Sequence, residues 1–152
     1  MAPMINARPG FVNYALNEPV GASQTIRKGD LIKYDAQKNV VKAAVGDAVL
    51  LGFATHDVTT GATPTIRDRL IVEPFHSQTL TRITVKNGVT VDRSLVGTSA
   101  GFIDEGNEIR LDPDGATKQA RIVEIVERGL PTKDPVEVYI EVPDAARIRN
   151  GA

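Results

Sequence analysis

The chain has 152 residues, 18 basic against 19 acidic side chains and no cysteine, so its formal net charge is −1. This length suits one domain that buries a core without cross-links, and the absence of cysteine excludes disulfides, thiolate zinc sites and a thiol nucleophile. The charges are balanced and interspersed, which argues against nucleic-acid binding, and no apolar run reaches the roughly 18 residues of a membrane span. We therefore expect a soluble, single-domain protein that binds neither nucleic acid nor membrane.

Residues 1–24 are predicted to form an extended N-terminal arm, because they contain several prolines and glycines and show neither a helical nor a strand period. The arm also carries large apolar side chains that cannot form a core by themselves. It either packs against its own domain or reaches a neighbouring chain, by adding a strand to a sheet or by inserting aromatic side chains into a groove. The residues that we expect to contact a partner are Ile5, Arg8, Phe11, Tyr14 and Leu16.

Residues 25–143 are predicted to form the β domain. Residues 30–34, 40–42 and 50–54 are short, β-favourable runs separated by turn-forming residues. Residues 70–74 and 79–86 continue this pattern. In the run 79–86, Thr81, Ile83 and Val85 alternate with more polar neighbours, which predicts one buried and one wet face.

Asn87-Gly88 lies between the β-favourable residues 84–86 and 89–91, and this dipeptide favours a type I′ turn, so a tight hairpin is predicted there. Residues 108–111 and 120–127 are further predicted strands, although residues 120–127 mix apolar and acidic side chains on both faces. Residues 136–142 alternate cleanly and are predicted to be the last strand. Residues 144–152 are predicted to form a C-terminal tail or a short helix that Asp144 caps. Many short strands with Gly and Pro turns predict a mostly β fold, a single small barrel-like domain.

Two groups of residues suggest chemistry. Gly97-Thr-Ser-Ala-Gly101 matches the G-x-S-x-G nucleophile elbow around Ser99, but both histidines precede this serine, whereas the α/β-hydrolase order places histidine after it. His56-Asp57, with His76 and Asp104, contains metal-ligand residue types, but adjacent strand residues point to opposite faces. We therefore expect no catalytic residue, no metal and no cofactor. A small serine hydrolase using Ser99 and a β-barrel module that binds a small molecule or glycan are the alternatives.

The segments Lys28-Gly-Asp-Leu-Ile-Lys-Tyr34, Asn39-Val-Val-Lys-Ala43 and Asp47-Ala-Val-Leu-Leu-Gly-Phe-Ala54 resemble the small β-rich decoration, or cement, proteins of tailed-bacteriophage heads. The likeness covers most of residues 28–142. It implies a β-tulip-like barrel, made in the cytoplasm of a bacterial host, that forms homotrimers on the outer capsid surface and bridges major capsid protein subunits. It implies no catalytic residues. The lack of cysteine and tryptophan, with nine prolines, also suggests a thermostable protein.

Overall fold

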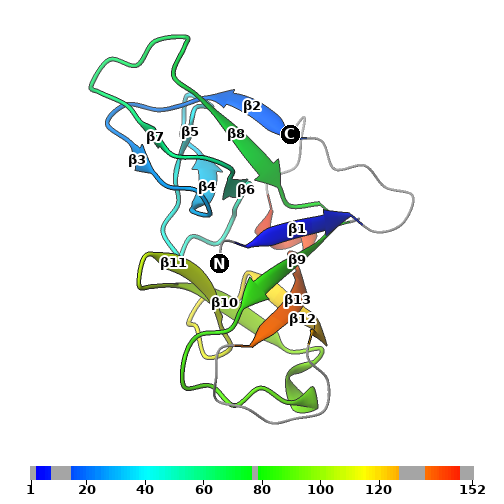
Figure 1. Cartoon of the computed structure of the whole chain (residues 1–152). Helices are drawn as coiled ribbons and strands as arrows, with labels where there is room; N and C mark the ends of the chain where they lie inside the picture. Colours follow the sequence, from blue (N-terminus) through cyan, green and yellow to red (C-terminus); the bar gives the residue numbers. More distant parts are fainter. Residues whose placement is uncertain (1–2, 8–14, 77–78, 127–135, 148–152) are drawn as a thin grey trace.

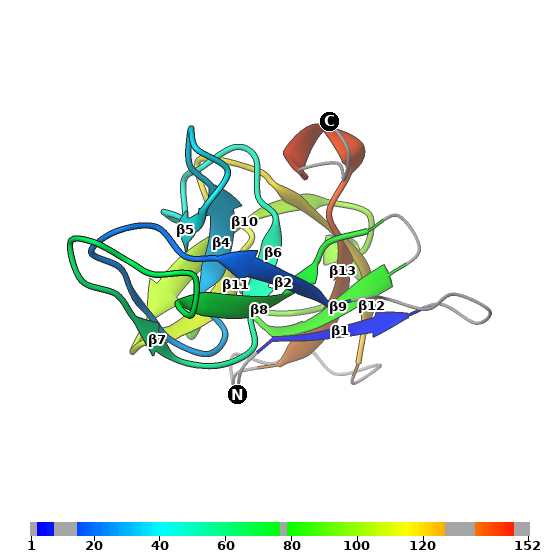
Figure 2. The same cartoon turned by 90° about the horizontal axis from the view of Figure 1, so that it is seen from above.

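The computed structural model of the chain describes residues 3–7, 15–76, 79–126 and 136–147. These residues form mainly short strands, which confirms the mostly β class predicted from the sequence (Figure 1). Most of the strands belong to two curled sheets that pack against each other (Figures 1 and 2).

The larger sheet has six antiparallel strands in the order β1-β9-β13-β12-β10-β11. It curls until β11 meets the end of β9, where Val85 and Leu111 form a single parallel bridge. The curl brings one face of these strands around a common interior. The strands are β1 (Met4–Ala7), β9 (Thr79–Thr84), β10 (Ser99–Glu105), β11 (Glu108–Asp112), β12 (Ala120–Ile125) and β13 (Glu137–Glu141).

The smaller sheet has five strands in the order β2-β8-β6-β4-β5 and curls in the same way. A parallel bridge between Val20 and Val40 joins its two ends, and the backbone N–H of Gly21 donates to the Val40 carbonyl at 2.9 Å. The strands are β2 (Leu16–Pro19), β4 (Leu31–Tyr34), β5 (Val40–Lys42), β6 (Gly52–Ala54) and β8 (Arg69–Pro74), with the two-stranded ribbon β3 (Thr25–Ile26) and β7 (Val58–Thr59) beside them.

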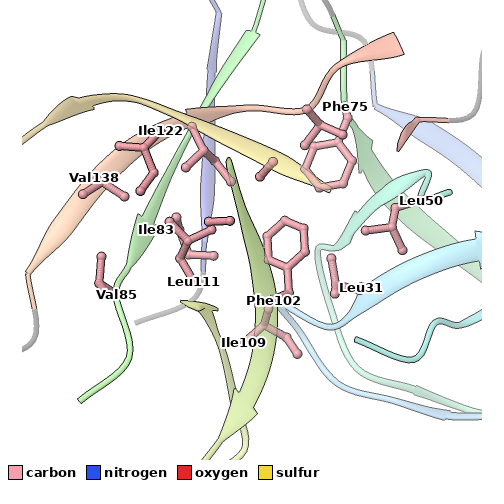
Figure 3. Close-up of a cluster of buried hydrophobic side chains, with 14 of the residues drawn as sticks. Leu31, Leu50, Phe75, Ile83, Val85, Phe102, Ile109, Leu111, Ile122 and Val138 are labelled. Carbon is pink, nitrogen blue, oxygen red and sulfur yellow. The ribbon is translucent and has the colours of Figure 1, made fainter. Parts of the chain in front are cut away.

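Strands β4 and β6 form a wall between two hydrophobic cores. Successive side chains of a strand point to opposite faces, so Leu31 enters one core and Ile32 the other, and Phe53 and Ala54 divide in the same way. The large core lies between the two sheets and includes Leu31, Leu50, Phe53, Phe75, Ile83, Val85, Phe102, Leu111, Ile122, Val138 and Ile140 (Figure 3). The small core lies inside the five-stranded sheet and contains Val20, Ile26, Ile32, Val40, Leu51, Ala54, Leu70 and Val72.

Three phenylalanines join the two sheets at the centre of the large core. Phe53 meets Phe75 and Phe102 edge-on, with ring centroids 5.1 and 6.2 Å apart, and Phe75 and Phe102 are stacked at 6.4 Å. Figure 3 shows Phe75 and Phe102 beside Leu31 and Leu50 of the smaller sheet. Such ring pairs contribute about 0.5–1.5 kcal/mol each beyond their buried area, so the trio fixes how the sheets pack.

The loop before β6 and the segment after β13 are tied to the opposite sheet. Gln119 is 1% exposed, and its side-chain amide donates to the carbonyls of Val45 and Asp47 at 2.6 and 2.9 Å. The backbone N–H of Leu50 donates to the Ala146 carbonyl at 2.9 Å. The predicted short helix after residue 143 is found as one 3-10 turn, Asp144–Ala146, whereas residues 148–152 lie outside the described part.

Two predicted strands are confirmed in detail. In β9 the side chains of Thr81 and Ile83 are buried and their neighbours are half-buried, and β13 alternates in the same way around Val138 and Ile140. The mixed pattern of residues 120–127 has a structural cause. The register of β12 against β13 shifts between Ile122 and Glu124, and this irregularity lets Ile122 and Ile125 both face the core.

The tight hairpin predicted at Asn87-Gly88 is wrong, although the turn exists. Gly88 has a φ of 83°, which a glycine adopts without strain. The chain does not return along β9, because β1 and β13 already occupy the two edges of that strand. After the turn it continues instead through a 3-10 turn, Arg93–Leu95, into β10.

We predict that Gly52→Ala abolishes stable folding. A Cβ at this position would lie 1.9 Å from the backbone oxygen of Glu73, and neither strand can move without opening the wall between the cores. Urea unfolding should show a loss of about 4 kcal/mol or more, or no folded protein. Gly61→Ala is the control, because its added Cβ meets no atom within 4 Å, and it should change stability by less than about 0.5 kcal/mol. Equal midpoints for both variants would contradict this packing.

Candidate functional site

The predicted arm contains two strands in its described part, and both pair with the chain's own sheets. Strand β1 lies along β9, with Ile5 opposite Thr81, and β2 lies along β8, with Leu16 opposite Val72. Leu16 is half-buried against the small core. Of the other residues expected to contact a partner, Arg8, Phe11 and Tyr14 lie outside the described residues. Their role stays a prediction.

The outer edge of β1 is the feature of this region most suited to binding another protein. β1 is the terminal strand of the six-stranded sheet, and no strand in the described part of the chain pairs with its outer edge. Alternate backbone N–H and C=O groups of an antiparallel edge strand point away from the sheet, so a strand of another chain can add there. The sequence reasoning missed this strand. A usable indication was the short run Met4–Ala7 bounded by Pro3 and Pro9.

The edge also lacks the usual protection. Natural edge strands are commonly blunted by charged residues or proline, which oppose pairing with another sheet. The β1 sequence Met-Ile-Asn-Ala contains neither. Because its partner strand β9 supports it along all four residues, this edge is presented as an ordered template.

Ser99 does not occupy a nucleophile elbow. Such an elbow places the serine between a strand and a helix, whereas Ser99 is the first residue of β10 and the following residues continue as strand. Its side chain is exposed, and its backbone lies opposite Arg121 of β12. The two glycines that complete the motif have different local roles, because Gly97 has a φ of 87° in a turn and Gly101 lies against the Thr117 backbone.

His56 and Asp57 bind separate backbone groups. The Nε2 atom of His56 accepts the N–H of Ile71 at 3.2 Å, and its Nδ1 atom lies 3.1 Å from the Asp57 carbonyl. The Asp57 carboxylate accepts the backbone N–H of Lys28 at 2.8 Å. Asp104 lies 3.7 Å from the Arg27 guanidinium. Among the described residues, no three His, Asp or Glu side chains are grouped so that they could hold a metal ion.

The carboxylate of Asp30, in the Lys28-Gly-Asp segment, is buried and serves the turn before β4. It accepts the backbone N–H of Arg27 at 2.8 Å and lies 3.4 Å from the Lys42 ammonium. Gly29 precedes it with a φ of 89°, a conformation that favours glycine. These contacts fix the entry of the chain into the wall between the cores.

A polar pocket of about 210 Å³ opens beside this turn. Ligand sites are usually larger, about 300–1,000 Å³, and mostly apolar or aromatic. No aromatic side chain lines this pocket, so it does not offer a platform for a sugar ring. Its lining residues are Pro3, Lys28, Gly29, Asp30, Asn107, Glu108 and Ile109.

Tyr34 has a strongly shifted ionisation. Burial raises the pKa of Tyr34 to about 12, and its hydrogen bond to Glu18 and the negative charge of that carboxylate act in the same direction. The two residues lie on β4 and β2, so this contact crosses the interior of the smaller sheet near the bridge that joins its ends. It stabilises the curl in which the small core is enclosed.

Within the described residues, no helix has the length and apolar character required to cross a membrane. Comparisons with protein-family models, with curated proteins and with solved structures gave no match. The site is therefore interpreted from the geometry of this chain.

We predict that the ionisation of Tyr34 lowers stability at alkaline pH. An unfolded tyrosine loses its proton near pH 10, whereas folded Tyr34 keeps it until about pH 12. The folded state therefore holds the extra proton between these values, so this stabilisation is complete below pH 10 and is lost as pH rises toward 12. Ultraviolet titration of tyrosinate should show one late step that Tyr34→Phe removes. Glu18→Gln should move that step to lower pH, and a Tyr34 pKa near 10 in the unchanged chain would contradict the contact.

Proposed function

We propose that this chain is a structural virion protein that binds the outside of a bacteriophage capsid and bridges major capsid protein subunits as a homotrimer. The observation that carries the proposal is the open, unprotected outer edge of β1 on a domain with two cores. Such an edge suits an attachment protein, because strand addition supplies several backbone hydrogen bonds across a protein boundary.

The resemblance to phage decoration proteins supports this proposal through the part of the fold that it covers. The three resembling segments contain β4, β5 and β6 and the turn of Asp30. These elements form the wall on which both cores depend. The likeness therefore falls on residues that determine the architecture.

The proposed action is a mechanical one. A homotrimer presents three copies of the β1 edge, and each copy adds a strand contact to a capsid subunit. Simultaneous contacts multiply, and linked binding sites commonly gain about 10²- to 10⁴-fold in avidity over one contact. The protein then stabilises the shell by joining subunits across their boundaries, with no chemical step.

We predict that removing residues 1–7 weakens capsid binding at least tenfold. The deletion removes the β1 edge but leaves β2 and both cores in place. The measurement is cosedimentation with empty, expanded heads of the virus that encodes the chain. The Gly61→Ala variant serves as the control, because its change lies in the smaller sheet and meets no atom.

Three outcomes separate the parts of this proposal. If the full chain does not bind the heads saturably, the capsid function is wrong. If the full chain and the shortened chain bind equally well, β1 is not the contact. Light scattering tests the assembly, since a homotrimer has about 49 kDa, three times the 16.3 kDa of one chain, and a monomer at all concentrations would contradict it.

A further inference from the structure

The loop between β7 and β8 carries the most exposed large apolar side chain of the described residues. Ile66 is 83% exposed, whereas Val49 and Ile71 are 44% and 42% exposed. The loop, residues 60–68, projects from the smaller sheet and away from the larger one, as both views show (Figures 1 and 2). Single exposed apolar side chains are common on protein surfaces, so the position of this one at the tip of a projection is what needs an explanation.

The base of the loop is held by hydrogen bonds on both sides. The Thr60 hydroxyl donates to the Gly21 carbonyl at 2.6 Å and accepts the N–H of Gln24 at 3.0 Å. On the returning side, the N–H of Val20 donates to the Asp68 carbonyl at 3.0 Å. The loop therefore begins and ends on the same segment, residues 20–24, beside the small core.

The tip is a hydrogen-bonded turn with Ile66 and Arg67 at its two central positions. The backbone N–H of Asp68 donates to the Thr65 carbonyl at 3.0 Å, and the Asp68 carboxylate accepts the N–H of Thr65 at 2.7 Å. The Thr65 hydroxyl accepts the N–H of Arg67 at 3.3 Å. The turn is thus ordered by its own side chains before any partner binds.

An ordered projection of this kind is suited to insertion. Burying an isoleucine side chain is favourable in proportion to the apolar area removed from water, and a preformed loop loses little conformational freedom on binding. The outer part of the loop, residues 60–66, has no charged side chain. Arg67 follows directly, is exposed, and forms no ion pair with the described residues.

We propose that this loop inserts Ile66 into an apolar pocket of another protein, with an acidic group at the rim of that pocket facing Arg67. The partner is a different protein and not a second copy, because the pocket formed by described residues of this chain is polar and lined by Lys28, Asp30 and Glu108. Resting on the proposed function, this partner is the major capsid protein. The loop and β1 lie apart in both views, on different sheets, so one chain can contact two capsid subunits at once (Figures 1 and 2).

We predict that Ile66→Ser weakens binding to the same expanded heads at least tenfold and leaves the thermal midpoint unchanged, since the side chain is 83% exposed in the isolated protein. Arg67→Glu should weaken binding most at low salt, because charge contacts at a rim are screened as ionic strength rises. Val49→Ser is the matched control, an exposed apolar residue outside the loop, and should bind like the unchanged chain.

A photo-crosslinking amino acid at position 66 identifies the partner directly, and the expected adduct is with the major capsid protein. If the unchanged chain binds heads and Ile66→Ser binds equally well, the insertion is wrong while the capsid function stands. If the unchanged chain does not bind, the capsid function itself fails. An adduct between two copies of the chain, or a lower oligomer mass of Ile66→Ser in light scattering, would overturn the choice of a different protein as partner.

Discussion

The burial of β4 and β6 on both faces is the constraint on which the rest of the fold depends. A strand with one wet face alternates apolar and polar side chains, whereas a strand covered on both sides carries a nearly continuous apolar run. Leu31 and Ile32 on β4, and Leu50 and Leu51 just before β6, are such pairs, and each pair supplies one residue to each core. The absence of a side chain at Gly52 lets the β8 backbone approach this wall.

The sequence predicts those elements whose environment follows from a period of two. Strands β9 and β13 have one buried face each, and their alternation is visible without knowledge of the partner strands. The number of cores is not predictable in this way, because an apolar pair such as Leu31 and Ile32 does not reveal what covers each side. The irregularity in β12 likewise reverses the alternation at a point that depends on β13.

The candidate site was harder to predict for a related reason. β1 and β2 are four residues long, and their order comes from edges of β9 and β8 that lie more than 50 residues away in the chain. Local composition therefore suggested only an arm. The turn at Asn87-Gly88 shows the converse, because its local conformation was predictable, whereas the pairing that follows depends on which edges of β9 are already occupied.

The shared wall has a consequence for synthesis on the ribosome. When residues up to about 75 have emerged, all five strands of the smaller sheet exist, but most of the side chains that cover Leu31, Leu50 and Phe53 have not been made. About 70 further residues are needed to reach Ala146, which at about 5–20 residues per second takes roughly 4–14 s. During that interval the nascent chain exposes an apolar surface, so chaperones have a defined target on it.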